Sequence, residues 1–215
     1  AVIVMPERIR SRNALMDIGA AGPIAGLVVA LPTLAYGLAT SEVSPLPERY
    51  QQEGQSLLYF LLKLAVLGHI PEGSDVMMNA TAFAGWTGLF VTALNLVPVG
   101  QLDGGHIAYA LFGPRWDRVV PWIMRGLLVV FAFNLARFVY PAYAAGRPLG
   151  VAFGNSTFWL VWFVLLSLMR WRAGENHPET DPGPIGAGRK ITGAVSLALF
   201  VLLFMPTPWA SYGFE

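Results

Sequence analysis

The sequence predicts an all-α polytopic membrane protein, a helical bundle preceded by one short β-strand. Of its 215 residues, 55% are hydrophobic and only 13% are charged, whereas soluble domains carry about 25% charged residues. Several apolar stretches also approach the roughly 20 residues that a helix needs to cross a bilayer. A net charge of +1 gives no indication of a nucleic-acid partner, and the absence of cysteine excludes disulfides, thiolate metal sites and a cysteine nucleophile.

The β-strand is predicted at Ala1 to Met5, a stretch rich in β-branched residues that Pro6 closes. The chain opens without an initiating methionine or a signal-peptide pattern, so we expect it to begin inside a longer natural protein. After a basic stretch, residues 17–39 form the first predicted span, which contains the letters GAAGPIAG.

The later apolar stretches predict one half-inserted helix and four further crossings. Residues 56–70 follow a polar, acidic loop, and they are short for a span and interrupted by Lys63. A re-entrant or interfacial helix therefore competes with a crossing there. The other spans are predicted at residues 79–99, 119–140, 157–169 and 191–205.

Basic residues give the predicted orientation, because loops rich in arginine and lysine face the cytoplasm. Three clusters fall on one face if residues 56–70 do not cross: Arg8, Arg10 and Arg12, then Arg115 and Arg118, then Arg170 and Arg172. We therefore predict a multi-pass integral membrane protein, embedded in the lipid bilayer, with its basic loops in the cytoplasm.

The most informative stretch reads NLVPVGQLDGGH, from Asn95 to His106, at the end of an apolar run. An aspartate inside a membrane is costly and usually functional. Asp103 could be an oxygen ligand or an acid, Gly104 and Gly105 would let another backbone or a substrate come close, and Pro98 would free a carbonyl. Alternatively the helix ends at the interface and Asp103 caps the next helix. Spacing alone leaves both interpretations open.

A family resemblance favours the functional interpretation. Asn95-Leu-Val-Pro98-Val-Gly-Gln-Leu102-Asp103-Gly104-Gly105 resembles the third core helix of the site-2 proteases, which are intramembrane zinc metalloproteases. Upstream, residues 19–26 resemble the G-P-x-A-G element of the second core helix, and Ala1 to Met5 resembles the small membrane-associated sheet. Residues 177–208 resemble a bacterial or archaeal branch. Residues 1–112 would then be part of the protease core, and residues 113–215 would be C-terminal transmembrane helices.

The resemblance implies a zinc cofactor, with Asp103 as one of three protein ligands and a membrane-spanning protein as the substrate. In this family an H-E-x-x-H helix provides two histidine ligands and a glutamate base. Asn95 would contact the substrate or the developing oxyanion. The structural residues near the site would be Gly22, Pro23, Gly26, Pro98, Gly104 and Gly105.

This chain departs from the family pattern because it contains no H-E-x-x-H. Its histidines are His69, His106 and His177, and none has a partner four residues away. We expect the missing motif upstream of Ala1, and we expect no stable zinc site and no activity from these residues alone. His106, three residues after Asp103, is expected to cap or support the site rather than bind metal.

Three further expectations concern packing and function. Gly22 and Gly26, four residues apart, should let residues 17–39 pack closely on residues 79–99. Ala1 to Met5 should be an edge strand that binds an unwound substrate by strand addition. Two other functions stay open. One is a non-catalytic relative that binds transmembrane segments. The other is a transporter, since a broken helix with a buried carboxylate also suits ion coupling, but the sequence shows no repeated half with a matching broken helix.

Overall fold

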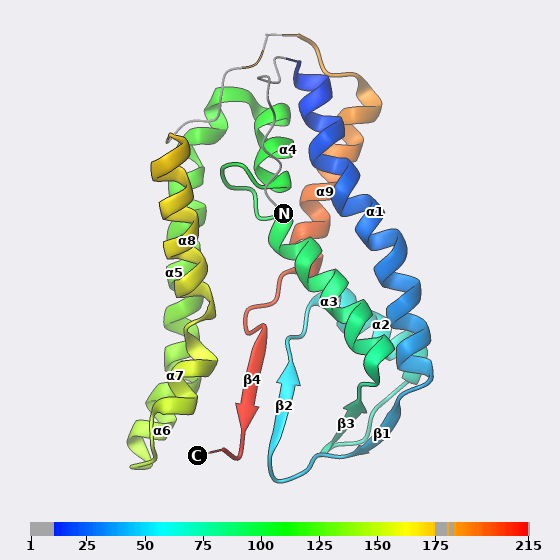
Figure 1. The fold of residues 1–215 in the computed structure, drawn as a ribbon, viewed down its shortest axis with the longest axis vertical. Helices are drawn as coiled ribbons and strands as arrows, with labels where there is room; N and C mark the ends of the chain where they lie inside the picture. The colour runs from blue at the N-terminus through cyan, green and yellow to red at the C-terminus, as the bar shows by residue number, and fades with distance from the viewer. Residues whose placement is uncertain (1–10, 175–179, 181–182, 215) are drawn as a thin grey trace.

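The computed structural model describes residues 11–174, 180 and 183–214. The predicted strand at Ala1 to Met5 lies outside these residues, and so does His177. The described chain is mostly helical, with short strands gathered at one end (Figure 1). In chain order the first elements are α1 (Arg12–Ala39), β1 (Glu42–Pro45), β2 (Tyr50–Glu53), α2 (Leu57–Leu67), β3 (Ser74–Met77), α3 (Ala80–Asn95) and α4 (Asp103–Phe112).

The second half of the chain begins with the 3₁₀-helix η1 (Gly113–Arg118), followed by α5 (Val120–Asn134). A π-helical stretch η2 (Leu135–Val139) continues α5 into α6 (Tyr140–Ala144). The remaining elements are α7 (Gly150–Ser156), α8 (Phe158–Ala173), α9 (Ala187–Leu203) and β4 (Trp209–Tyr212).

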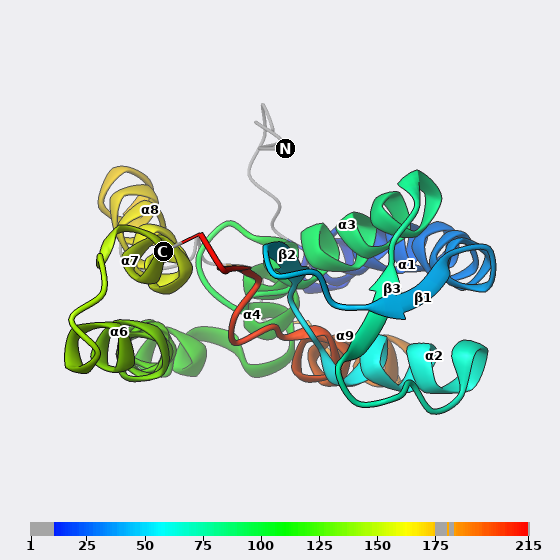
Figure 2. The same cartoon turned by 90° about the horizontal axis from the view of Figure 1, so that it is seen from below.

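The helices form two groups, which Figure 2 shows from below. One group, α1 to α4 with α9, shares a hydrophobic core that includes Leu34, Leu89 and Ile107. The other group pairs α5 with α8 around Met124, Leu127 and Trp159. Strands β2 and β4 and the segment that leads into β4 lie between the two groups.

Helix α1 packs along α3 through small residues, as the sequence predicts. The backbone at Gly37 approaches Ala82 on α3, and a Cβ on Gly26 would lie 3.1 Å from the Thr92 hydroxyl. The prediction that α1 and α3 pack through Gly26 is therefore confirmed. For Gly22 it is wrong, because a Cβ there would instead meet Asp103 on α4. The helix extends past the α3 contact, and Gly22 lies opposite the next helix.

The number of membrane crossings is only partly supported. Two continuous helical stretches, Arg12–Ala39 and Val120–Ala144, are long and apolar enough to span a bilayer, and α7 with α8, bent by 50°, would make a third. Helices α3 and α9 have only 16 and 17 residues. The five predicted crossings therefore stay a prediction. Helix α2 has 11 residues, about 16 Å, which is about half of a bilayer core.

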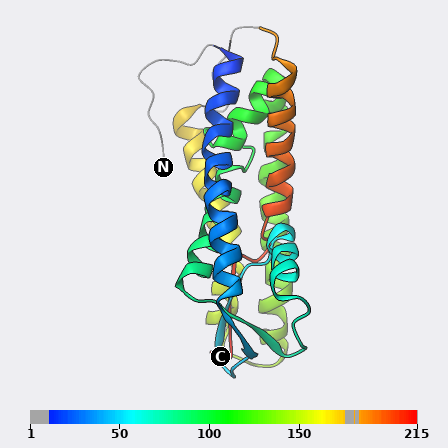
Figure 3. The same cartoon turned by 90° about the vertical axis from the view of Figure 1, so that its right-hand side faces the viewer.

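Four short strands correct the expectation of an otherwise all-α chain. β1 pairs antiparallel with β3, and β2 pairs antiparallel with β4. Figure 3 shows α1, in blue, running from the opposite end of the molecule to this strand-bearing end. The polar composition of residues 42–53 predicts a loop. The two strands in this stretch, β1 and β2, have only four residues each, and each pairs with a segment later in the chain.

Candidate functional site

Asp103 is the first residue of α4 and follows a tight turn that leaves α3 after Asn95. Gly100 adopts a left-handed conformation (φ +60°) in this turn, which a residue with a side chain rarely tolerates. Pro98 does not break the helix, since α3 ends three residues earlier. Its carbonyl accepts a hydrogen bond from Trp116 Nε1 at 3.0 Å, a partner that the sequence reasoning missed.

Gly104 and Gly105 allow the backbone of the preceding turn to approach α4 closely. A Cβ on Gly104 would collide with the carbonyl oxygen of Leu96, and a Cβ on Gly105 would collide with that of Gly100. Both residues are buried. The first turn of α4 is thus pressed onto the preceding turn, so these glycines position the start of α4.

Helix α1 forms a second glycine contact on the other side of Asp103. A Cβ on Gly19 would lie 3.0 Å from the Asp103 carbonyl oxygen, and one on Gly22 would lie 3.3 Å from Asp103 Oδ2. The GAAGPIAG stretch therefore faces the Asp103 carboxylate. We refer to Gly19 and Gly22 as the α1 notch. Pro23, in the same helix, is buried.

The Asp103 side chain is only partly buried, and its carboxylate makes no hydrogen bond or ion pair with another described residue. Asn95 is also partly buried, and its amide likewise has no such partner within the described part of the chain. His106 lies one turn further along α4, is buried, and packs against Gly19. These three residues lie at or beside the turn that joins α3 to α4.

The described residues do not by themselves complete a metal site. Among them, no group of three histidine, cysteine, aspartate or glutamate side chains could hold a metal ion. His69 is exposed just after α2, and α2 does not contact α4 closely enough to bring it to Asp103. Carboxylate oxygens are among the ligands that bind zinc in proteins, so Asp103 suits the role of one ligand, and a complete set would need ligands from outside the described residues.

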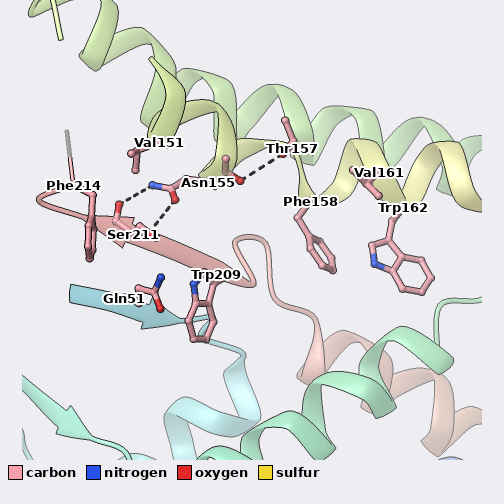
Figure 4. Close-up of a pocket in the computed structure, with 11 residues that line it drawn as sticks. Gln51, Val151, Asn155, Thr157, Phe158, Val161, Trp162, Trp209, Ser211 and Phe214 are labelled. Atoms are coloured by element: carbon pink, nitrogen blue, oxygen red, sulfur yellow. Dashed lines mark hydrogen bonds between the residues drawn. The ribbon is translucent and has the colours of Figure 1, made fainter. Parts of the chain in front are cut away.

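Two clefts lie away from Asp103, beside the strands. One, of about 680 Å³, is lined by the aromatic residues Phe158, Trp162, Trp209 and Phe214 (Figure 4). Asn155 connects α7 to β4 at the side of this cleft. Its side-chain amide donates to the Ser211 carbonyl and accepts from the Ser211 N–H, both at 2.9 Å. The other cleft, of about 420 Å³, lies between β2 and β3.

A buried polar cluster underlies the second cleft. Lys63 of α2 lies 2.5 Å from Asp75 Oδ1 and 3.8 Å from Glu53 Oε1. Tyr59 donates a hydrogen bond to Glu53 at 2.7 Å. Burial raises the pKa of the Glu53 carboxyl, although the Tyr59 hydrogen bond and the Lys63 charge oppose that rise. Helix α2 thus turns its polar residues inward, while Leu57, Phe60, Leu61 and Leu64 are exposed.

Comparisons with known proteins show similarity to one peptidase family and to several plant proteins. The model of peptidase family M50 matches residues 1–136. A rice protein (Oryza sativa subsp. indica) named probable zinc metalloprotease EGY3, chloroplastic, is 33% identical over 68% of this chain and 22% of its own length. The Arabidopsis thaliana protein named probable zinc metalloprotease EGY1, chloroplastic, is 29% identical over 94% of this chain and 33% of its own.

Another Arabidopsis thaliana protein, named DDT domain-containing protein PTM, is 36% identical over 51% of this chain and 7% of its own length. No solved structure matches. The chain spans about a fifth to a third of the length of the metalloprotease relatives. These relatives are chloroplast proteins of plants, so the expected likeness to a bacterial or archaeal branch finds no support in them.

Proposed function

Because the chain belongs to peptidase family M50, we propose that it forms part of an intramembrane zinc metalloprotease that hydrolyses peptide bonds of membrane-spanning proteins. The observation that carries the proposal is the Asp103 carboxylate. It begins α4 in the family's L-D-G-G motif, the α1 notch faces it, and it lacks a partner among the described residues. A partly buried carboxylate in an apolar protein is costly unless a cation or another ligand balances its charge.

In this proposal Asp103 supplies one oxygen ligand, and the remaining ligands and the general base come from outside the described residues. The bound metal would lower the pKa of a water molecule and polarise the peptide carbonyl. The chain's own contribution is placement. The backbone contacts of Gly104 and Gly105 fix the start of α4, and the α1 notch leaves room beside the carboxylate.

Asn95 is the second candidate for direct contact with the substrate. It is the last residue of α3, and its amide is free of hydrogen bonds with other described residues. An amide of this kind can hold an extended peptide backbone or donate to an oxyanion. Asn95→Ala should then lower kcat while zinc content stays at the wild-type level, which separates its role from that of Asp103.

The test is Asp103→Asn in the full-length protein, with cleavage of a membrane-spanning substrate and zinc content measured together. The amide keeps the shape of the carboxylate but is a poor ligand, so zinc content should fall and cleavage should drop by at least about 100-fold. Glu42→Gln, on the exposed strand β1, is the matched control and should behave as the wild type. Normal cleavage by Asp103→Asn would refute the assignment.

A non-catalytic relative that binds transmembrane segments is the second candidate. It is favoured by the lack of a complete metal-binding group within the described residues. In that case the full-length protein should hold no zinc and should still capture a membrane-spanning segment. Zinc analysis of the wild-type protein distinguishes the two functions.

A further inference from the structure

The arginine that opens α1 contacts the far end of α4. Arg12 Nη2 donates to the Ala110 carbonyl at 2.6 Å and to the Leu111 carbonyl at 3.3 Å, and Arg12 Nε donates to Ala110 at 3.1 Å. Arg12 Nη1 also reaches the Gly183 carbonyl at 3.5 Å, just before α9. The sequence suggested only that Arg12 was one of the basic residues that set the orientation in the membrane.

These hydrogen bonds satisfy backbone carbonyls in the last turn of α4. The last four carbonyls of a helix have no partner within it. Gly113 N–H returns to the Tyr109 carbonyl, and Arg12 satisfies the next two. A cation at a helix C-terminus also interacts favourably with the helix dipole. Arg12 is therefore a C-terminal cap for α4 that is supplied by another helix.

Helix α1 thus touches both ends of α4. Gly22 faces the Asp103 carboxylate at the N-terminal end, and Arg12 holds Ala110 and Leu111 at the C-terminal end. Helix α4 has ten residues, about 15 Å, so a shift at one end is transmitted to the other. At the N-terminal end, Leu102 provides no side-chain cap, and the contacts there are steric ones through glycine.

We propose that Arg12 is a positioning residue for Asp103: its hydrogen bonds fix the axial position and rotation of α4 and thereby the location of the carboxylate. The inference rests on the proposed metal-binding role of Asp103. Glycine contacts prevent α4 from moving closer to α1 but do not prevent it from moving away. The directed hydrogen bonds of Arg12 supply the missing restraint.

The test compares Arg12→Gln, Arg12→Lys and Arg189→Gln in the full-length protein. Arg189 is the matched control because it also joins α1, through two 2.8 Å hydrogen bonds to Asp17, but makes none to α4. Zinc affinity is measured by chelator competition, and kcat and KM by substrate cleavage. Arg12→Gln should weaken zinc binding about tenfold, which corresponds to about 1.4 kcal/mol, and should lower kcat with little change in KM.

Arg12→Lys, which keeps the charge but loses the forked donors, should fall between Arg12→Gln and the wild type, and Arg189→Gln should match the wild type. A readout that needs no metal is hydrogen exchange of the α4 amides in the metal-free, detergent-solubilised full-length protein. Exchange should accelerate in Arg12→Gln and stay unchanged in Arg189→Gln.

The outcomes separate this inference from the proposed function. If Asp103→Asn keeps its zinc, the proposed function fails. If Asp103→Asn loses zinc while Arg12→Gln binds it as the wild type does, the positioning role of Arg12 fails alone. If Arg12→Gln loses its helical circular-dichroism signal, the Arg12→Lys variant decides. Weaker zinc binding by Arg12→Lys with native helicity supports the positioning role. Zinc binding by Arg12→Lys equal to that of the wild type overturns it. Equal losses in Arg12→Gln and Arg189→Gln would also overturn it.

Discussion

The carboxylate of Asp103 lies between two glycine contacts of different kinds. Gly104 and Gly105 accommodate carbonyls of the preceding turn, and Gly22 faces the carboxylate itself. The motif identified these residues from the sequence, but letter patterns do not distinguish a glycine that admits backbone from one that leaves space for a ligand. The hydrogen bonds of Trp116 to Pro98 and of Arg12 to Ala110 could not be predicted, because they join residues that are not neighbours in the sequence.

Gly104→Ala should destabilise the fold, since its methyl group would overlap the Leu96 carbonyl, which is backbone and cannot turn away. Overpacking of this kind costs about 1–3 kcal/mol. The matched control is Gly126→Ala on α5, where a Cβ would meet nothing within 4 Å and where helix propensity should add up to about 1 kcal/mol of stability. Thermal unfolding in detergent measures both, and a Gly104→Ala variant as stable as Gly126→Ala would contradict the crowding.

At the scale of elements, the sequence predicts helices better than strands. The apolar runs at residues 17–39, 79–99 and 191–205 correspond to α1, α3 and α9, although α1 begins earlier, at Arg12. Hydrophobic length is a local property and survives in the fold. Strands β1 to β4 could not be predicted, because a stretch of four residues becomes a strand only when another segment pairs with it.

The packing of α2 should depend on pH through Glu53, which lies at the end of β2 and contacts Tyr59 and Lys63 of α2. A carboxyl group with a raised pKa in the folded state binds its proton more tightly there than in the unfolded chain. Its contribution is therefore fully present below the ordinary glutamate pKa and is lost as pH rises through the raised one. Glu53→Gln removes this titration, so its stability relative to the wild type should increase over that pH range.

The measurement is the unfolding midpoint of the detergent-solubilised chain between pH 4 and pH 8, with the wild type and Glu53→Gln compared at each pH. Glu42→Gln, an exposed position on β1, controls for the loss of one surface carboxylate. A difference between Glu53→Gln and the wild type that stays constant over the whole pH range would contradict the assignment of this pH dependence to Glu53.

At the scale of the whole molecule, two helical groups share few direct contacts. Helix α5 packs mainly on α8, whereas α1 packs on α3, α4 and α9. Between the groups runs the non-helical stretch after α9. There Asn134 of α5 donates to the Pro206 carbonyl at 2.9 Å and Trp159 of α8 donates to it at 3.0 Å. Composition predicts membrane helices, but it carries no information about which helices associate.

The stretch Val120–Ala144 should cross the bilayer once, so its two flanks should lie on opposite sides. The chain contains no cysteine, so single cysteines can be placed at will. Arg115→Cys and Ala145→Cys are both at exposed positions. In sealed vesicles of known orientation, a membrane-impermeant maleimide should label one from outside and the other only after the vesicles are opened. Labelling of both from the same side would exclude the crossing.

The pairing of β2 with β4 also has a consequence for the order of events during synthesis. Tyr50 pairs with Tyr212 and Glu53 with Trp209. The ribosome therefore synthesises β4 roughly 150 residues after β2, which takes about 10–30 s at usual elongation rates. Through that interval the β2 edge is unpaired while α2 and α3 are already complete. An unpaired strand edge can associate with another chain, and the nascent protein would be most vulnerable to chaperone binding or misassembly during this period.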